Sequence, residues 1–167
     1  MSRLGLNTLG WLSVALLALA LGGCGFQLRG AVELPGSLQP LYLSGYQFSQ
    51  TVRELRRALN ANDVAVADGR EGARAAVLIH EDRLDRRVLS VNRDGDAQEY
   101  ELTYLLDFSV VDAQGRERIE RQRILIQRDF LFDETGVLGK EGEQEQLHKE
   151  MIREAVQQLL RRLSSAG

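Results

Sequence analysis

The sequence predicts an α+β protein, a two-layer sandwich in which two helices pack on a four-stranded sheet of mixed or antiparallel type. Residues 99–111 alternate between apolar and polar side chains, as a half-buried strand does. Residues 49–62 and 143–164 repeat apolar side chains at helical spacing, so each segment has one apolar stripe. A sheet with one apolar face requires cover, and two such helices supply it.

The first elements are a short strand and a helix. Residues 41–43 are the strand candidate, and residues 49–62 are the helix. Thr51, with Glu54 three residues later, is typical of a capping box, and Asn62 is a plausible left-handed terminator. Because a helix follows the first strand, that strand can pair parallel to a neighbour, which would make the sheet mixed.

Three consecutive strands are predicted next, over residues 75–92, 99–111 and 118–132. The Asp-Gly pair at 94–95 is a strong signal for a hairpin turn, and residues 112–115 make the second turn. Strands joined by short turns form an antiparallel meander.

Two departures from regular alternation are visible in these strands. Val88, Leu89 and Val91 change face midway through the first of them, which indicates a bulge. Leu105 is an apolar side chain on the otherwise mainly polar face of the second.

A loop is predicted over residues 133–142, because glycines recur there at 136, 139 and 142. The helix over 143–164 then follows. Its acidic residues lie early and its arginines lie late, an order that suits the helix dipole.

The composition excludes several classes of function. The net charge of the 167-residue chain is −3, so a general nucleic-acid binder is not expected. The two histidines, His80 and His148, have no metal-ligand spacing, and we expect both to be solvated or satisfied polar side chains. The sequence has no histidine-assisted nucleophile, Gly-x-Ser-x-Gly elbow or P-loop, so we expect no enzyme, no cofactor and no metal.

The N-terminus has the features of a cleaved secretory signal over residues 1–23. An apolar stretch of about 13 residues is too short to span a membrane, which takes roughly 20. It ends in Leu-Gly-Gly before Cys24, the only cysteine, and this resembles the bacterial lipobox. The resemblance implies that Cys24 becomes the N-terminus and carries an S-diacylglycerol and an N-palmitoyl chain, an anchor to a membrane. Residues 24–40 would then be a tether and residues 41–167 a single α+β domain.

Arginines accumulate on two of the predicted strands. The first set is Arg83, Arg86, Arg87 and Arg93, and the second is Arg116, Arg118, Arg121, Arg123 and Arg128. They fit either a solvated face balanced by neighbouring acidic residues or a surface that recognises phosphate or carboxylate. The residues alone leave both interpretations open.

The residues after Cys24 read Gly-Phe-Gln-Leu-Arg-Gly, and this stretch resembles the start of mature LPS-assembly lipoproteins of the LptE family. The resemblance continues through the hairpin at 90–100, the segment at 128–144 and the helix at 149–163, in the same order and with similar spacing. Gly25 after the cysteine resembles lipoproteins sorted to the outer membrane. The fold implied by the family, two helices on a four-stranded sheet, agrees with the architecture predicted above.

The resemblance implies a function and a location. LptE-family proteins sit as a plug inside the outer-membrane barrel LptD, help it assemble, bind lipopolysaccharide and help to insert it into the outer leaflet. The family's basic lipopolysaccharide-binding positions correspond to Arg93 and Lys140. We therefore expect a protein anchored to the outer membrane, with its domain on the periplasmic side or inside the barrel. Alternatives are a structural subunit of another outer-membrane assembly machine and a ligand-binding envelope lipoprotein.

Overall fold

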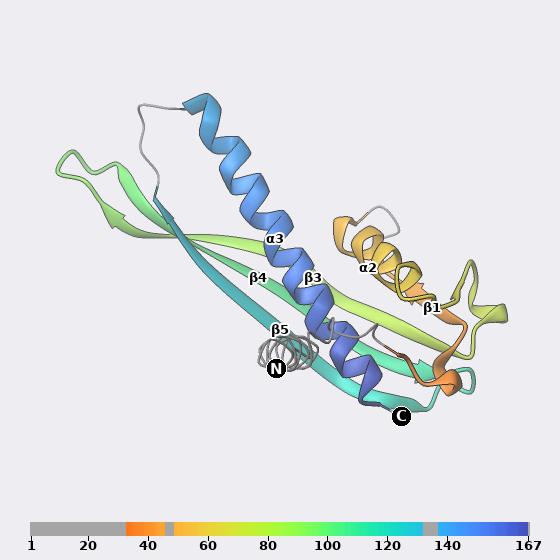
Figure 1. Cartoon of the computed structure of the whole chain (residues 1–167). Coiled ribbons are helices and arrows are strands. Elements are labelled where there is room, and N and C mark those ends of the chain that lie inside the picture. Colours follow the sequence, from red (N-terminus) through yellow and green to blue (C-terminus); the bar gives the residue numbers. More distant parts are fainter. Residues whose placement is uncertain (1–32, 46–48, 132–136, 167) are drawn as a thin grey trace, which may run out of the picture. The chain divides into compact units, whose positions relative to one another are not determined.

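Five strands form one layer of the protein, and two helices cover one face of that layer (Figure 1). The computed structural model describes residues 33–45, 49–131 and 137–166, and the backbone alone over 137–141. The strands are β1 (Leu41–Ser44), β2 (Val66–Ala67), β3 (Ala75–Val91), β4 (Ala97–Asp112) and β5 (Glu117–Leu131). Their order in the sheet is β2-β1-β3-β4-β5.

The predicted two-layer α+β architecture is confirmed, but the predicted number of four strands is wrong. The additional strand, β2, pairs parallel to β1 through two residue pairs, Leu41 with Val66 and Tyr42 with Ala67. Two residues are too few to show the alternation that identifies a strand in a sequence. β1 also pairs parallel to β3, so the sheet is mixed, as the helix between them predicts.

β3, β4 and β5 form the predicted antiparallel meander, with β4 at its centre. The β3–β4 register shifts after Ile79 and again after Val88. The second shift confirms the bulge predicted from the change of face over residues 88–91. The first shift leaves His80 outside the regular pairing, and the residues after it change face, since Ile79 pairs with Phe108 but Glu81 with Asp107.

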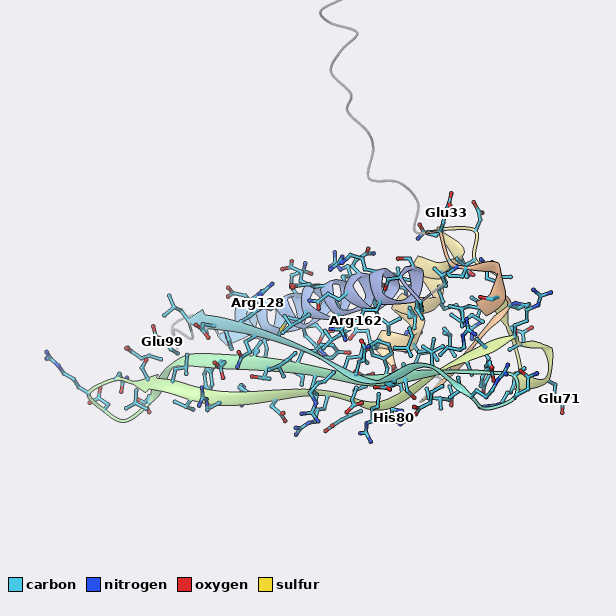
Figure 2. The ribbon with its side chains drawn as sticks, turned by 90° about the horizontal axis from the view of Figure 1, so that it is seen from below. Glu33, Glu71, His80, Glu99, Arg128 and Arg162 are labelled. Carbon is cyan, nitrogen blue, oxygen red and sulfur yellow. The ribbon has the colours of Figure 1, made fainter. Side chains whose placement is uncertain are left out.

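The two faces of β4 differ in what covers them. Its even-numbered residues from Leu102 to Val110 belong to the hydrophobic core under the helices. Its odd-numbered residues lie on the opposite face, which we call the outer face. Asp107 and Ser109 are each only 3 % exposed there, because neighbouring side chains lie over them. Figure 2 shows His80 on the outer face and Arg162 on the side of the helices.

Helix α2 spans Gln50–Asn60, and its first turn differs from the predicted capping box. Ser49 is the N-cap, and its Oγ accepts a hydrogen bond from the backbone N–H of Val52 at 3.0 Å. Thr51 lies inside the helix and is 1 % exposed, so the capping box at Thr51 is wrong. Ser49 and Thr51 both have a hydroxyl group, and the packing of α2 on the sheet decides which of them caps the helix.

Thr51 belongs instead to a buried polar cluster that joins α2, β3 and β4. The hydroxyl of Tyr104 donates to Asp82 Oδ1 at 2.7 Å. Thr51 Oγ1 donates to the same oxygen at 3.0 Å and lies 2.6 Å from the Tyr104 hydroxyl oxygen. Burial, together with the Asp82 charge, raises the pKa of Tyr104. The phenol therefore stays neutral and acts as a hydrogen-bond donor that fixes α2 on the sheet.

The end of α2 also corrects one predicted residue. Asp63, not Asn62, takes the left-handed conformation, with a φ of 56°. The side-chain amide of Asn62 donates to the Ala58 carbonyl at 2.7 Å, which satisfies one of the last carbonyls of the helix. Asn62 thus ends the helix through its side chain and Asp63 through its backbone.

Helix α3 spans Val137–Ser164, so it begins six residues before the predicted start at 143. The predicted loop over 133–142 is therefore wrong from residue 137 onward. Gly139 and Gly142 lie inside the helix, although a glycine there costs about 1 kcal/mol relative to alanine. Propensity of this size is overridden when a helix has a long apolar stripe to bury. The buried stripe consists of Met151, Ile152, Ala155, Val156, Leu159, Leu160 and Leu163.

The core also includes residues that precede the first strand. Leu34 and Leu38 are 7 % and 1 % exposed and belong to the same hydrophobic cluster as the helices and the sheet. Leu38 lies in a short 3-10 turn, η1 (Gly36–Leu38), and a second such turn, η2 (Arg70–Gly72), precedes β3. Residues 34–38 are therefore packed on the domain.

Candidate ligand-binding site at the hairpin end

The predicted binding residue Arg93 lies in the turn between β3 and β4, and its side chain is exposed. The side-chain oxygen of Asn92 holds this turn by accepting hydrogen bonds from the backbone N–H groups of Asp94 and Asp96, each at 2.9 Å. Gly95 has a φ of 92°, a conformation that favours glycine, so the predicted Asp-Gly turn is confirmed. A turn held by Asn92 and by its own backbone presents the Arg93 side chain to solvent.

The second predicted binding residue, Lys140, lies in the first turn of α3 and not in a loop. Its side chain, like the whole of Cys24, is outside the described residues. The β3–β4 hairpin and the first turn of α3 lie toward the same end of the sheet, away from β1 (Figure 1). We call this the distal end and define it as residues 86–101, 127–131 and 137–147.

Large apolar side chains are exposed at the distal end. Val88, Leu89, Val91 and Leu131 are 48 %, 42 %, 57 % and 70 % exposed. Leu131 follows Phe130, and consecutive strand residues point to opposite faces, so one of the two must lie away from the core. Leu89 and Leu131 line one cleft, and contiguous exposed apolar surface marks interaction sites for proteins or membranes. The sequence predicts a change of face at residues 88–91 but not this exposed surface, although the Phe-Leu pair at 130–131 is a signal for it.

A cleft of about 370 Å³ lies within the distal end. Its apolar lining consists of Leu89, Phe130, Leu131 and Leu147, and its polar lining consists of the carboxylates of Glu99, Asp129 and Glu143. Glu99 also accepts a hydrogen bond from the Ser90 hydroxyl at 2.8 Å. Three carboxylates make this cleft unsuitable for a phosphate. Arg93 in the hairpin turn is therefore a better position for a phosphate at the distal end, and the cleft suits apolar groups.

Stacked side chains support the distal end from beneath α3. The guanidinium of Arg86 lies 4.8 Å from the ring centroid of Tyr100, and Tyr100 stacks on Phe130 with centroids 5.5 Å apart. Arg86 Nη1 also donates to Gln144 Oε1 at 3.2 Å, and this contact ties β3 to α3. Arg86 therefore has a structural role, whereas Arg93 lies beyond these contacts.

The arginines of the outer face mostly meet carboxylates. Arg83 pairs with Glu81 at 2.7 Å, and Arg87 with Glu101 at 3.0 Å. One edge of the Arg121 guanidinium donates two hydrogen bonds to Asp107, from Nε to Oδ1 at 2.8 Å and from Nη2 to Oδ2 at 3.1 Å. The Arg121 hydrogen bond holds the pKa of Asp107 below its usual range although burial opposes this. For these arginines the structure favours the interpretation of a balanced, solvated face.

The sequence profile of the family described as "LptE: Lipopolysaccharide-assembly" matches residues 38–163, which is more than half of the chain. The chain belongs to the LptE family. The LPS-assembly lipoprotein LptE of Pectobacterium atrosepticum is 30% identical over 155 residues, which cover 91% of this chain and 83% of that protein.

Two solved structures of lipoproteins resemble this LptE-family chain. Lipoprotein B from Nitrosomonas europaea is 31% identical, with a TM-score of 0.71 over 84% of this chain and 91% of the other. Rare lipoprotein B from Shewanella oneidensis is 31% identical, with a TM-score of 0.64 over 75% of this chain and 93% of the other. Both support the α+β architecture.

Membership of the LptE family settles the class of the protein. It is a non-enzymatic lipoprotein of lipopolysaccharide assembly, as predicted. Among the helices that the structure describes, none is long and apolar enough to cross a membrane.

One hydrogen bond in this LptE-family protein differs from the sequence prediction that no histidine assists a nucleophile. His80 Nε2 lies 2.8 Å from Ser109 Oγ. The pair depends on the bulge at residue 80, which a sequence does not place. Asp107 does not orient the imidazole, because both its oxygens accept hydrogen bonds from Arg121. His80 is therefore a satisfied polar side chain.

His148 is also accounted for by packing, since its ring lies 5.9 Å from the ring of Tyr104. Within the described parts of the chain, no group of three or more histidine, cysteine or acidic residues is placed to hold a metal ion.

Proposed function

We propose that this protein is an outer-membrane lipoprotein that forms a complex with the barrel LptD and assists its assembly. In this proposal it also binds lipopolysaccharide and helps to insert it into the outer leaflet. The observation that carries the proposal is the distal end, where exposed apolar side chains lie near the exposed Arg93 of the hairpin turn. Lipopolysaccharide combines phosphates with acyl chains, so it requires both kinds of surface.

The anchor in this proposal is Cys24, which carries an S-diacylglycerol and an N-palmitoyl chain after removal of residues 1–23. Several acyl chains give stable anchoring, because each buried methylene contributes about 0.8 kcal/mol. Residues 24–40 would then connect the anchor to the domain, on the periplasmic side of the outer membrane or inside the barrel.

The ligand contacts in this proposal are Arg93 and Lys140. A guanidinium on a hairpin and an ammonium at the start of α3 suit two phosphates, because charge-assisted hydrogen bonds are about twice as strong as neutral ones. Val91 and Leu131, which are 57 % and 70 % exposed, would meet acyl chains or the wall of the barrel.

The ligand part is tested with Arg93→Glu combined with Lys140→Glu. We expect lipopolysaccharide to bind at least roughly tenfold more weakly, because two charge-assisted contacts are replaced by repulsion. The measurement is a titration with purified lipopolysaccharide, accompanied by circular dichroism. The control is Arg70→Glu with Arg118→Glu, which changes the net charge equally; both arginines are exposed and lie near the opposite end of the sheet. Equal affinity of the two double variants would reject the site.

The partner part is tested by purification from membranes. We expect LptD to co-purify with the wild-type chain and to be reduced by Leu131→Asp, which places a charge in the apolar surface. Leu125→Asp is the matched control, since Leu125 is 54 % exposed on the same face of β5 but lies six residues before Leu131, outside the distal end. Recovery of a protein-insertion barrel in place of LptD would contradict the proposal and favour another assembly machine.

A further inference from the structure

A second cleft, of about 410 Å³, lies between the two helices. Figure 1 shows α2 and α3 side by side over the same face of the sheet. The lining consists of Gln50, Arg53, Glu54 and Arg57 from α2, and Lys149, Ile152 and Arg153 from α3. Ile152 is 2 % exposed and forms an apolar part of the lining. We call this the interhelical cleft.

The spacing of these residues explains how the cleft forms. Arg53 and Arg57 are four residues apart on α2, and Lys149 and Arg153 are four residues apart on α3. Residues at this spacing share one face of a helix. Two cationic faces therefore line the cleft, although their residues are 92 to 100 positions apart in the sequence.

The charge of the cleft is opposite to that of the chain. Four cations and one carboxylate give the lining a net charge of +3, whereas the whole chain carries −3. Glu54 pairs with Arg57 at 2.8 Å, and Lys149 pairs with Glu145 at 3.4 Å, on the neighbouring turn of α3. Arg153 Nε donates to the backbone carbonyl of Lys149 at 3.3 Å, a contact that adds no negative charge to the lining. With Glu145 counted, four cations and two carboxylates leave a net charge of +2 at the cleft.

We infer that the interhelical cleft is a binding site for a phosphate group. A phosphate monoester carries about −1.5 to −2 charges and three acceptor oxygens, which suits guanidinium and ammonium donors on two sides better than a single carboxylate does. The phosphate can belong to a lipid headgroup or to a soluble phosphate. The site is independent of the function proposed above, because Arg93 and Lys140 are not part of its lining.

The test is a titration of the full-length protein in detergent with inorganic phosphate, followed by amide chemical shifts of α2 and α3. We expect saturable shifts around Ile152 that require at least tenfold more phosphate in the variant with Lys149→Ala and Arg153→Ala. The control variant has Arg118→Ala and Arg161→Ala, two exposed arginines outside the lining. Acetate at equal ionic strength is the second titrant.

The outcomes separate the sources of phosphate. If the protein binds phosphatidic acid vesicles more tightly than phosphatidylcholine vesicles, and the cleft variant removes this difference, the site takes a lipid headgroup. If phosphate titrates the cleft and the vesicles do not distinguish the variants, the site takes a soluble phosphate. Equal shifts from acetate, or equal phosphate titrations of the two double variants, would overturn the inference.

Discussion

The outer face of the sheet and the interhelical cleft both contain several arginines, but the two regions differ in how many carboxylates lie near these arginines. On the outer face, Arg83, Arg87 and Arg121 each meet a carboxylate. At the cleft, the four cations of the lining outnumber two nearby carboxylates, Glu54 and Glu145. The number of arginines in a segment therefore says little about binding, and the local balance of charge decides it.

The difference follows from the periodicity of the elements. Antiparallel strands place side chains of neighbouring strands directly opposite one another, so Arg87 faces Glu101 and Arg123 faces Asp107. Helices place residues four apart on one face, and both α2 and α3 have a pair of like charges at this spacing. On the outer face, pairs of opposite charges thus stabilise the fold. In the cleft, the surplus of positive charge can bind an anionic ligand.

The largest effect is expected from breaking the charge pairing at Asp107. This carboxylate is 3 % exposed and accepts two hydrogen bonds from Arg121, with Arg123 at 3.7 Å. Asp107→Asn should lower the free energy of unfolding by about 2 kcal/mol, because hydrogen bonds to charged groups contribute about 1.5–3 kcal/mol. Urea denaturation of the purified full-length chain measures the change.

Asp85→Asn is the matched control for Asp107→Asn. Asp85 pairs with Arg83 at 3.1 Å, but its side chain is 50% exposed, so water screens the pair. Such surface pairs contribute about 0–1 kcal/mol. Equal losses of stability in the two variants would show that burial of Asp107 does not strengthen its pairing.

The next effect concerns pH and two buried carboxylates, Asp107 and Asp112. The pKa of Asp107 is lowered by the Arg121 hydrogen bond. That of Asp112 is lowered by hydrogen bonds from the backbone and side chain of Arg116, although burial opposes the shift. A lowered pKa contributes stability that is present above the unfolded-state pKa of about 3.9 and lost as pH falls through the folded-state pKa.

The gap in stability between the wild type and Asp107→Asn should therefore stay constant from about pH 5 to 8 and shrink below about pH 4. Urea midpoints measured at intervals from neutral pH down to about pH 3 would show this. A gap that persists unchanged at the acidic end would mean that the Asp107 charge does not stabilise the fold.

Most of the fold could be predicted because its elements are long and regular. The alternation of β4 and the apolar stripe of α3 extend over many residues, so tertiary contacts do not change their type. β2 has two residues and no pattern, and it exists only because Leu41 and Tyr42 offer an edge to pair with. The N-cap was misplaced by two residues because Ser49 and Thr51 have the same chemistry, and only the burial of Thr51 distinguishes them.

The sites were less predictable because they depend on contacts between distant segments. The sequence predicts the hairpin that presents Arg93, since an Asp-Gly turn is a local signal. It does not predict the pairing of His80 with Ser109, which depends on the bulge in β3. The two cationic faces of the interhelical cleft can be read from their spacing, but nothing in the spacing shows that α2 and α3 lie side by side.

The smallest expected effect tests the surplus of positive charge in the cleft. Arg153→Gln removes one of the like charges at positions 149 and 153. Such pairs at this spacing cost about 0.2–0.5 kcal/mol in a helix, so the variant should be slightly more stable than the wild type at low salt. The gain should vanish near 1 M NaCl, where the screening length falls to about 3 Å. Thermal unfolding at the two salt concentrations measures both values. A loss of stability at low salt would instead mean that Arg153 has a stabilising partner, and the contrast between the cleft and the outer face would no longer hold.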